Sequence, residues 1–169
     1  MKIVYQGSPG AYSHLAAKKI YPEYEFIPYN TFEDCFKHCN ENEEHKTIIP
    51  VENSIAGRVA DIQYLINKYK LQIYAEHFQE IKHNLMILKD NELKNVKSVR
   101  SHSQAISQCQ KLINSNKFEP IIAADTAGSA KYISEKKINN EAAIASELAA
   151  KIYDLKIVKK NIEDNRSNV

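Results

Sequence analysis

Apolar and polar positions along the chain alternate with two different periods, and the pattern predicts strands and helices in turn. Short apolar runs rich in β-branched residues predict buried strands, whereas apolar residues spaced three and four apart predict amphipathic helices. The predicted strands are residues 2–6, 25–29, 47–51, 96–101, 120–124, 142–145 and 156–162. The predicted helices are residues 12–20, 31–39, 59–69, 104–113, 126–136 and 147–153, with Thr31 as the N-cap of the second. Residues 71–88 contain no Pro or Gly and are predicted as one or two extended strands.

Strands that alternate with helices indicate an α/β fold in which parallel strands are joined by right-handed crossovers. Two such sets, joined by the extended segment, predict two lobes of mostly parallel sheet with flanking helices around a cleft. We assign residues 1–80 together with residues 158–169 to the first lobe, and residues 81–157 to the second. No repeat, low-complexity stretch or Ser/Gly linker separates the lobes into independent domains.

Composition and charge exclude several classes of protein. The chain has 169 residues, and 23 Lys+Arg against 21 Asp+Glu give a net charge of only +2, with the lysines scattered, so we expect no nucleic-acid partner. No run approaches the ~20 apolar residues that span a bilayer, and the amino terminus turns polar too early for a secretory signal. We therefore expect a cytoplasmic protein without membrane contact. Only three arginines, Arg58, Arg100 and Arg166, are available to hold an anion.

The three cysteines are an odd number, which suits a reducing compartment better than a disulfide framework. Cys35 and Cys39 lie four apart on a predicted helix with His38 between them, which is half of a metal site. No second pair of ligands is evident, and two reduced thiols on one helix face explain the spacing as well. We therefore expect no metal.

Small polar residues gather where the predicted strands end, which is the edge at which open parallel sheets bind ligands. The residues are Ser13, Glu52, Asn53, Ser54, Ser101, Thr126 and Ser146. Helix N-termini there offer unpaired amides, so they can hold carboxylates without many arginines. Each signal has a structural alternative: Ser and Thr often only cap helices, and Asn often only shapes a turn. Gln104 and Gln108, one turn apart, suit an exposed helix face, and Ser101 and Gln108 can share a face.

Several sequence blocks nevertheless occur in an order typical of one enzyme family. They are Gly7, Gly10, Tyr12 and Ser13; Pro50, Glu52, Asn53, Ser54 and Gly57; Ser101, His102, Gln104, Ala105, Gln108 and Cys109; Thr126-Ala127; Ala142–Ser146; and Ile162–Asn165. Through these blocks the chain resembles the catalytic domain of prephenate dehydratases over almost its whole length.

The resemblance implies a fold like that of a type II periplasmic binding protein and the conversion of prephenate to phenylpyruvate, water and carbon dioxide in phenylalanine biosynthesis. It implies a lyase that needs no cofactor, with prephenate as its small-molecule partner and a possible homo-oligomeric state. The implied catalytic residues are Glu52, Asn53, Ser101 and Gln108. The implied substrate-binding residues are Ser13, Asn53, Ser54, Ser101, Thr126 and Ser146.

Two features depart from the family pattern. Ser103 replaces the usual Pro, and the family's catalytic Thr-Arg-Phe motif is expected about where the sequence stops, at Asn168-Val169. From this we expect a formed substrate cleft, impaired turnover and no regulatory ACT domain. Two alternatives stay open: a non-catalytic module of the same architecture that binds a small organic acid, and the same chemistry on arogenate.

Overall fold

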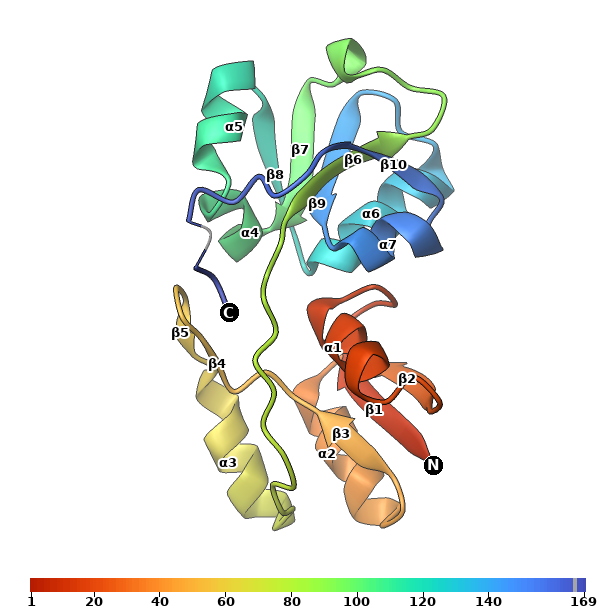
Figure 1. Ribbon diagram of the computed structural model, residues 1–169, viewed down its shortest axis with the longest axis vertical. Helices are drawn as coiled ribbons and strands as arrows, with labels where there is room; N and C mark the ends of the chain where they lie inside the picture. The colour runs from red at the N-terminus through yellow and green to blue at the C-terminus, as the bar shows by residue number, and fades with distance from the viewer. Residues whose placement is uncertain (166) are drawn as a thin grey trace. The chain divides into compact units, whose positions relative to one another are not determined.

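The computed structural model describes residues 1–165 and 167–169, and the chain divides into two compact units. Unit 1 comprises residues 1–8, 12–80 and 169, and unit 2 comprises residues 9–11 and 81–168. Each unit is a β-sheet flanked by α-helices (Figure 1). The predicted α/β class with mostly parallel sheets and flanking helices is confirmed.

Unit 1 is built on a parallel three-stranded sheet with the order β2-β1-β3. Its strands are β1 (Lys2–Gln6), β2 (Glu25–Tyr29) and β3 (Lys46–Ile48), and its helices are α1 (Tyr12–Ile20), α2 (Phe32–Glu41) and α3 (Ala60–Tyr69). A short antiparallel hairpin of β4 (Glu52–Asn53) and β5 (Gly57–Arg58) follows β3. The hydroxyl of Thr31 accepts a hydrogen bond from the amide of Asp34 at 3.1 Å, which confirms the predicted N-cap of α2.

The central strand of unit 1 packs on both faces because successive side chains of a strand point in opposite directions. The ring of Tyr5 stacks on His14 of α1, with ring centroids 4.8 Å apart. Val4 instead packs with Cys35 and Cys39 of α2. The two helices therefore cover opposite faces of β1.

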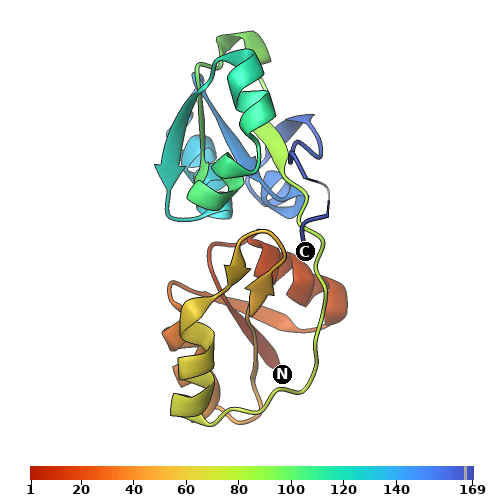
Figure 2. The same ribbon diagram turned by 90° about the vertical axis from the view of Figure 1, so that its left-hand side faces the viewer.

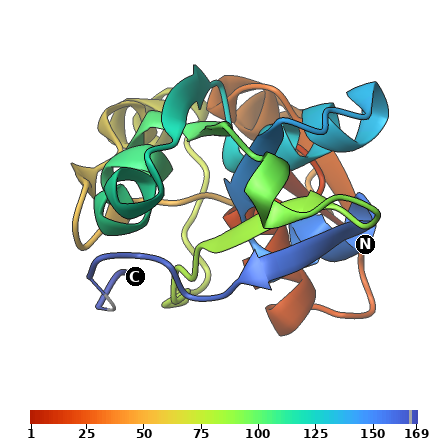
Figure 3. The same ribbon diagram turned by 90° about the horizontal axis from the view of Figure 1, so that it is seen from above.

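Unit 2 is built on a five-stranded sheet with the order β10-β6-β9-β7-β8 (Figures 2 and 3). Its strands are β6 (Asn84–Leu88), β7 (Ser98–His102), β8 (Glu119–Ala123), β9 (Glu141–Ala145) and β10 (Leu155–Lys159). Its helices are the 3₁₀ helix η1 (Leu93–Asn95) and α4 (Ser103–Ser107), α5 (Gln110–Asn116), α6 (Thr126–Lys136) and α7 (Glu147–Ile152). Strand β7 runs parallel to β8 and β9, whereas β6 runs antiparallel to β9 and β10.

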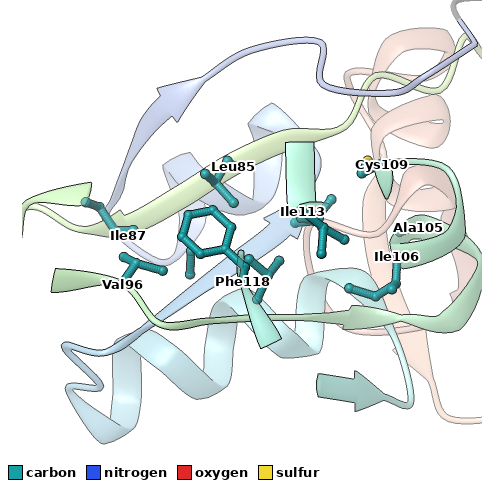
Figure 4. Packing of buried hydrophobic residues seen from close by; sticks show 11 residues of the cluster. Leu85, Ile87, Val96, Ala105, Ile106, Cys109, Ile113 and Phe118 are labelled. Atoms are coloured by element: carbon teal, nitrogen blue, oxygen red, sulfur yellow. The ribbon is translucent and has the colours of Figure 1, made fainter. Parts of the chain in front are cut away.

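Alternate residues of β6 reach two separate hydrophobic clusters. Leu85 and Ile87 pack with residues of α4 and α5 and with Phe118, as Figure 4 shows. Met86 and Leu88 pack with the alanines of α6 and α7. The sheet of unit 2 is thus covered by α4 and α5 on one face and by α6 and α7 on the other (Figure 1).

One local expectation was wrong. Only residues 84–88 of the predicted extended segment form a strand, and residues 71–83 carry no regular structure. Strand β6 runs antiparallel to β9 and β10. Residues 89–97, which lead from β6 to β7, contain only η1 and no α-helical crossover of the kind that joins parallel strands.

The predicted helix over residues 104–113 is interrupted between α4 and α5. In a continuous helix the carbonyl of Gln108 would accept a hydrogen bond from the amide of Leu112. Here it accepts one from the amide of Asp164, at 2.7 Å. Ser101 and Gln108 do not share a helix face, because Ser101 lies in β7 and Gln108 is the C-cap of α4.

The carboxy-terminal segment differs from its predicted assignment. Residues 158–169 are assigned to the first lobe by the sequence, but residues 158–165, 167 and 168 group with unit 2, and Val169 groups with unit 1. The reason is that β10 pairs along β6, and the segment after it continues to bond within unit 2. The amide of Ile162 donates to the carbonyl of His83 at 2.9 Å.

Candidate functional site

The polar residues predicted at strand ends in unit 2 gather at one edge of its sheet. Because β7, β8 and β9 are parallel, their carboxyl ends lie at the same edge. Ser101 lies near the end of β7, Thr126 follows β8, and Ser146 follows β9. Antiparallel β6 begins at this edge, where Asn84 pairs with Ala145.

The hydroxyls of two of these residues are engaged inside unit 2. Ser101 is fully buried, and its Oγ donates to the carbonyl of Ile144 at 2.7 Å. Ser146 is also buried, and its Oγ donates to the carbonyl of Gly10 at 2.6 Å. The same Oγ accepts from the amide of Ala149 and so caps α7. Both hydroxyls therefore stabilise the edge itself.

The N-terminus of α6 carries a negative group. Asp125 is the N-cap residue, and its carboxylate accepts a hydrogen bond from the amide of Gly128 at 2.5 Å. Thr126 is the half-buried first residue of the helix. Because the carboxylate already satisfies this helix end and would repel an anion, α6 is a poorer anion site than the sequence suggested.

Gln108 lies at the break between α4 and α5 and is held by residues distant in the sequence. Its Oε1 lies 2.9 Å from Nε2 of His83 and 2.8 Å from Nδ2 of Asn168. Burial lowers the pKa of His83, although the hydrogen bond to Gln108 and the charge of Glu163 oppose this effect. His83 is therefore neutral at pH 7 and carries a single ring N–H.

Sequence reasoning missed the residues that surround Gln108. The amide of His83 donates to the carboxylate of Glu163 at 2.9 Å, and His83, Glu163 and Asn168 are all buried. The carboxylate of Asp164 accepts from the amide of Lys111 in the first turn of α5, at 3.2 Å. The sequence signals available were a His before one apolar strand, His83, and an acidic pair after another, Glu163 and Asp164. No pattern in the sequence indicates that these residues meet in the fold.

In unit 1, Asn53 shapes the turn between β4 and β5. Its Oδ1 accepts hydrogen bonds from the amides of Ile55 at 3.0 Å and Ala56 at 2.9 Å. Exposed Glu52 lies directly opposite Arg58 in the hairpin, so both side chains are on one face. The hairpin thus presents an amide whose oxygen end is fixed.

The remaining predicted residues of unit 1 are Ser54 and Ser13. Ser54 exchanges two hydrogen bonds with Val169, of 2.9 Å and 3.0 Å, one of them through its hydroxyl. Ser13 is half-buried in the first turn of α1. Of the eight predicted site residues, the structure thus groups Glu52, Asn53 and Ser54 on one hairpin, and Ser101, Thr126 and Ser146 at one sheet edge.

One of the three arginines is committed to a structural ion pair. Arg100 donates through Nε and Nη2 to the carboxylate of Glu141, at 2.7 Å and 3.3 Å. Its guanidinium also lies 4.3 Å from the centre of the Tyr132 ring. These contacts engage Nε and Nη2 of Arg100 within unit 2 and pair its charge with that of Glu141.

The cysteine pair of α2 is buried and reduced. Burial raises the pKa of Cys35 to about 12 and that of Cys39 to about 11, so both are thiols at neutral pH. His38 between them bonds instead to the hydroxyl of Tyr29 and to the ring of His45. Within the described part of the chain, no group of three or more His, Cys, Asp or Glu residues could hold a metal ion.

No helix in the described ranges is both long enough and apolar enough to cross a membrane.

Among curated proteins, the chain is 36% identical over 169 residues to arogenate dehydratase/prephenate dehydratase 2 of Arabidopsis thaliana, covering 100% of this chain and 44% of that protein. It is 34% identical over 166 residues to the bifunctional N-acyl-homoserine lactone acylase/prephenate dehydratase of Komagataeibacter europaeus, covering 98% of this chain and 59% of that protein. The chain therefore spans about half the length of these relatives.

Solved structures show the same fold. The structure described as GqqA, a novel type of quorum quenching acylase, matches with a TM-score of 0.92 and 33% identity over 99% of this chain and 61% of that one. The prephenate dehydratase of Staphylococcus aureus matches with a TM-score of 0.84 and 25% identity over 99% of this chain and 63% of that one. The family model described as prephenate dehydratase matches residues 3–169. The chain belongs to the prephenate dehydratase family.

Proposed function

We propose that this chain provides the catalytic domain of a prephenate dehydratase, a lyase of phenylalanine biosynthesis. In this reaction the ring carboxylate leaves as carbon dioxide, and the electrons of the broken carbon–carbon bond move into the ring. The ring hydroxyl departs with a proton as water, and the ring becomes aromatic. The protein has to orient a dianion and supply a proton donor, without a cofactor.

The observation that carries the proposal is the orientation of two carboxamides. The oxygen of Asn53 is bonded to two backbone amides of its turn, and the oxygen of Gln108 is bonded to His83 and Asn168. In Asn53 these bonds fix the oxygen end of the amide, and in Gln108 they turn the amide so that its nitrogen is the end that can donate to a ligand. Neutral donors suit a dianionic substrate where arginines are few.

The other predicted residues take supporting parts in this proposal. Ser101 and Ser146 shape the sheet edge, because their hydroxyl protons are already donated to backbone carbonyls. Ser13, Ser54 and Thr126 remain candidates for contact with substrate oxygens. Glu52 orients neighbouring groups, since a bare carboxylate would repel the dianion.

Arogenate is a second candidate substrate. It carries an amine where prephenate carries a keto oxygen, and the names of several relatives include arogenate dehydratase. A binding module that holds a small organic acid without turnover is the third alternative. A cytoplasmic location and a homo-oligomeric state also remain proposals, and some relatives are named as chloroplastic.

The test measures the formation of phenylpyruvate from prephenate and, in parallel, the formation of phenylalanine from arogenate. Each reaction is assayed with residues 1–169 and with a chain extended through the family's Thr-Arg-Phe motif. We expect turnover in the extended chain and weak or no turnover in the shorter one. Binding without turnover in both chains would favour the binding module, and no binding at all would refute the proposal.

Asn53 provides a matched pair of variants. Asn53→Asp keeps an oxygen for the two turn amides but replaces the donating nitrogen by a second oxygen, whereas Asn53→Ala removes both. We expect both variants to lose turnover by about 10²-fold or more, as when an oxyanion donor is removed. We expect only Asn53→Ala to lower stability as well, by about 1–2 kcal/mol. Near-normal turnover in Asn53→Asp would remove this amide from the site.

A further inference from the structure

Two buried residues from opposite ends of unit 2 hold the side chain of Gln108 by its oxygen. Nε2 of His83 and Nδ2 of Asn168 lie 2.9 Å and 2.8 Å from Oε1. His83 is only 3% exposed and Asn168 only 1%. Buried side chains of this kind have few rotamers open to them, so they fix the atom to which they bond.

The backbone of Gln108 is fixed as well. Its N–H donates to the carbonyl of Gln104 at 3.0 Å, and its carbonyl accepts from the amide of Asp164 at 2.7 Å. Among residues 1–165 and 167–169, no group accepts a hydrogen bond from Nε2 of Gln108. Within the described residues, the backbone N–H, the backbone carbonyl and Oε1 of Gln108 are therefore bonded, and the side-chain nitrogen Nε2 is the polar group left to donate.

His83 is in turn positioned by the segment that follows β10. Its backbone carbonyl accepts a hydrogen bond from the amide of Ile162 at 2.9 Å. Its backbone amide donates one to the carboxylate of Glu163, also at 2.9 Å. The neutral ring of His83 carries one N–H. His83 can donate to Oε1 of Gln108 only if this proton is on Nε2. Ile162 and Glu163 thus position one partner of Gln108, and Asn168 from the same end of the chain is the other, although all three lie far from Gln108 in the sequence.

We propose that His83 and Asn168 are positioning residues that hold the Gln108 amide as a donor to a carboxylate or hydroxyl oxygen of the substrate. This inference rests on the proposed dehydratase function. If the amide turned round, Oε1 would face the anionic substrate and repel it. Loss of a direct oxyanion donor lowers turnover by about 10²–10³-fold, so misalignment of the donor lowers kcat/KM by at least about tenfold.

Variants at three positions, made in the chain extended through the Thr-Arg-Phe motif, separate this role from a structural one. His83→Leu removes the ring donor, whereas His83→Gln keeps an N–H of similar reach and should restore most of kcat/KM. Asn168→Asp replaces the donor by an acceptor, which should attract Nε2 of Gln108 and turn the amide round. In a Gln108→Ala background, His83→Leu should cause no further loss, because its effect is exerted through Gln108.

The closing experiment combines these kinetics with the tautomer of His83, read from nitrogen–proton correlations in labelled protein without substrate. We expect the Nε2–H tautomer and a non-additive double-mutant cycle. The Nδ1–H tautomer would overturn the inference, because Gln108 would then have to donate to His83. Additive losses, or no rescue by His83→Gln, would also overturn it. A chain extended through the Thr-Arg-Phe motif that still showed no turnover would instead refute the proposed function, while the tautomer would still decide the orientation of Gln108.

Discussion

Replacing Gly10 by Ala should destabilise unit 2 strongly, because the new methyl group has neither a permitted backbone conformation nor room. Gly10 has a φ of +95°, where L-residues lose about 1–2 kcal/mol. A Cβ there would lie 2.7 Å from Cα and 2.9 Å from Cβ of Ala149. The backbone of α7 would have to move, and such overpacking typically costs about 1–3 kcal/mol. We therefore expect a loss of about 2–5 kcal/mol.

Gly57 provides the control, since it shares the conformation but not the crowding. Its φ is +84°, and a Cβ there would meet no atom within 4 Å. Gly57→Ala should therefore cost only the conformational part, about 1–2 kcal/mol. The difference between the two variants isolates the close approach of the Gly10 turn to α7.

The appropriate assay is hydrogen exchange followed separately for the two units, because a chain with two units need not unfold in one step. Amides of β9 report on unit 2 and amides of β1 report on unit 1. Gly10→Ala should lower the protection of β9, and Gly57→Ala should not. Urea unfolding followed by circular dichroism gives the accompanying change in free energy.

Equal losses of protection in β9 for Gly10→Ala and Gly57→Ala would refute the reasoning, since only Gly10 is crowded by Ala149. The result also concerns the candidate site. The carbonyl of Gly10 accepts the hydroxyl proton of Ser146, so a shift of this turn would also disturb the edge that Ser146 stabilises. The glycine of the family's opening block is thus explained by packing at this edge.

Three further predictions follow from the contacts of unit 2. Ser146→Ala should lower stability by about 1–2 kcal/mol, because it removes a helix cap and a buried hydrogen bond, whereas exposed Ser107→Ala should change the thermal midpoint little. Arg100→Lys should cost about 1–2 kcal/mol in urea unfolding, because Lys cannot bond Glu141 through two nitrogens, and an unchanged midpoint would contradict this. The pKa of His83 is 6.5 in an unfolded chain and lower in the folded protein. As the pH falls below 6.5, the unfolded state therefore takes up a proton before the folded state does. Stability is therefore present above pH 6.5 and falls as the pH decreases from there, at no more than about 1.4 kcal/mol per pH unit, and His83→Gln should flatten this decline.

Local patterns predicted most of the secondary structure because most of it depends on neighbours in the sequence. The strand at residues 2–6 and the capped helix after Thr31 follow from side-chain period and a hydroxyl at the right position. The break between α4 and α5 could not be predicted in this way. It depends on the amide of Asp164, which reaches the carbonyl of Gln108 only after the whole of unit 2 has folded.

In the candidate site, likewise, the sequence predicts some features, and others depend on tertiary contacts. The positions of Thr126 and Ser146 follow from a general rule about the ends of parallel strands, so the sequence was enough to predict them. The engagement of the Ser146 hydroxyl depends instead on Gly10, and the orientation of Gln108 depends on His83 and Asn168. Residue type and spacing indicate which groups are available, but tertiary contacts decide which atom of each group can meet a ligand.

The preference for neutral donors agrees with the direction in which charge moves during the proposed reaction. Negative charge leaves the departing carboxylate and develops on the departing hydroxyl oxygen. A guanidinium bonded to that carboxylate would stabilise the substrate more than the transition state and would raise the barrier. The charge of Arg100 is paired with that of Glu141, which weakens its attraction for a substrate carboxylate. An amide nitrogen such as Nε2 of Gln108 binds more weakly, and it lowers the barrier to the extent that it lies nearer the leaving hydroxyl than the leaving carboxylate.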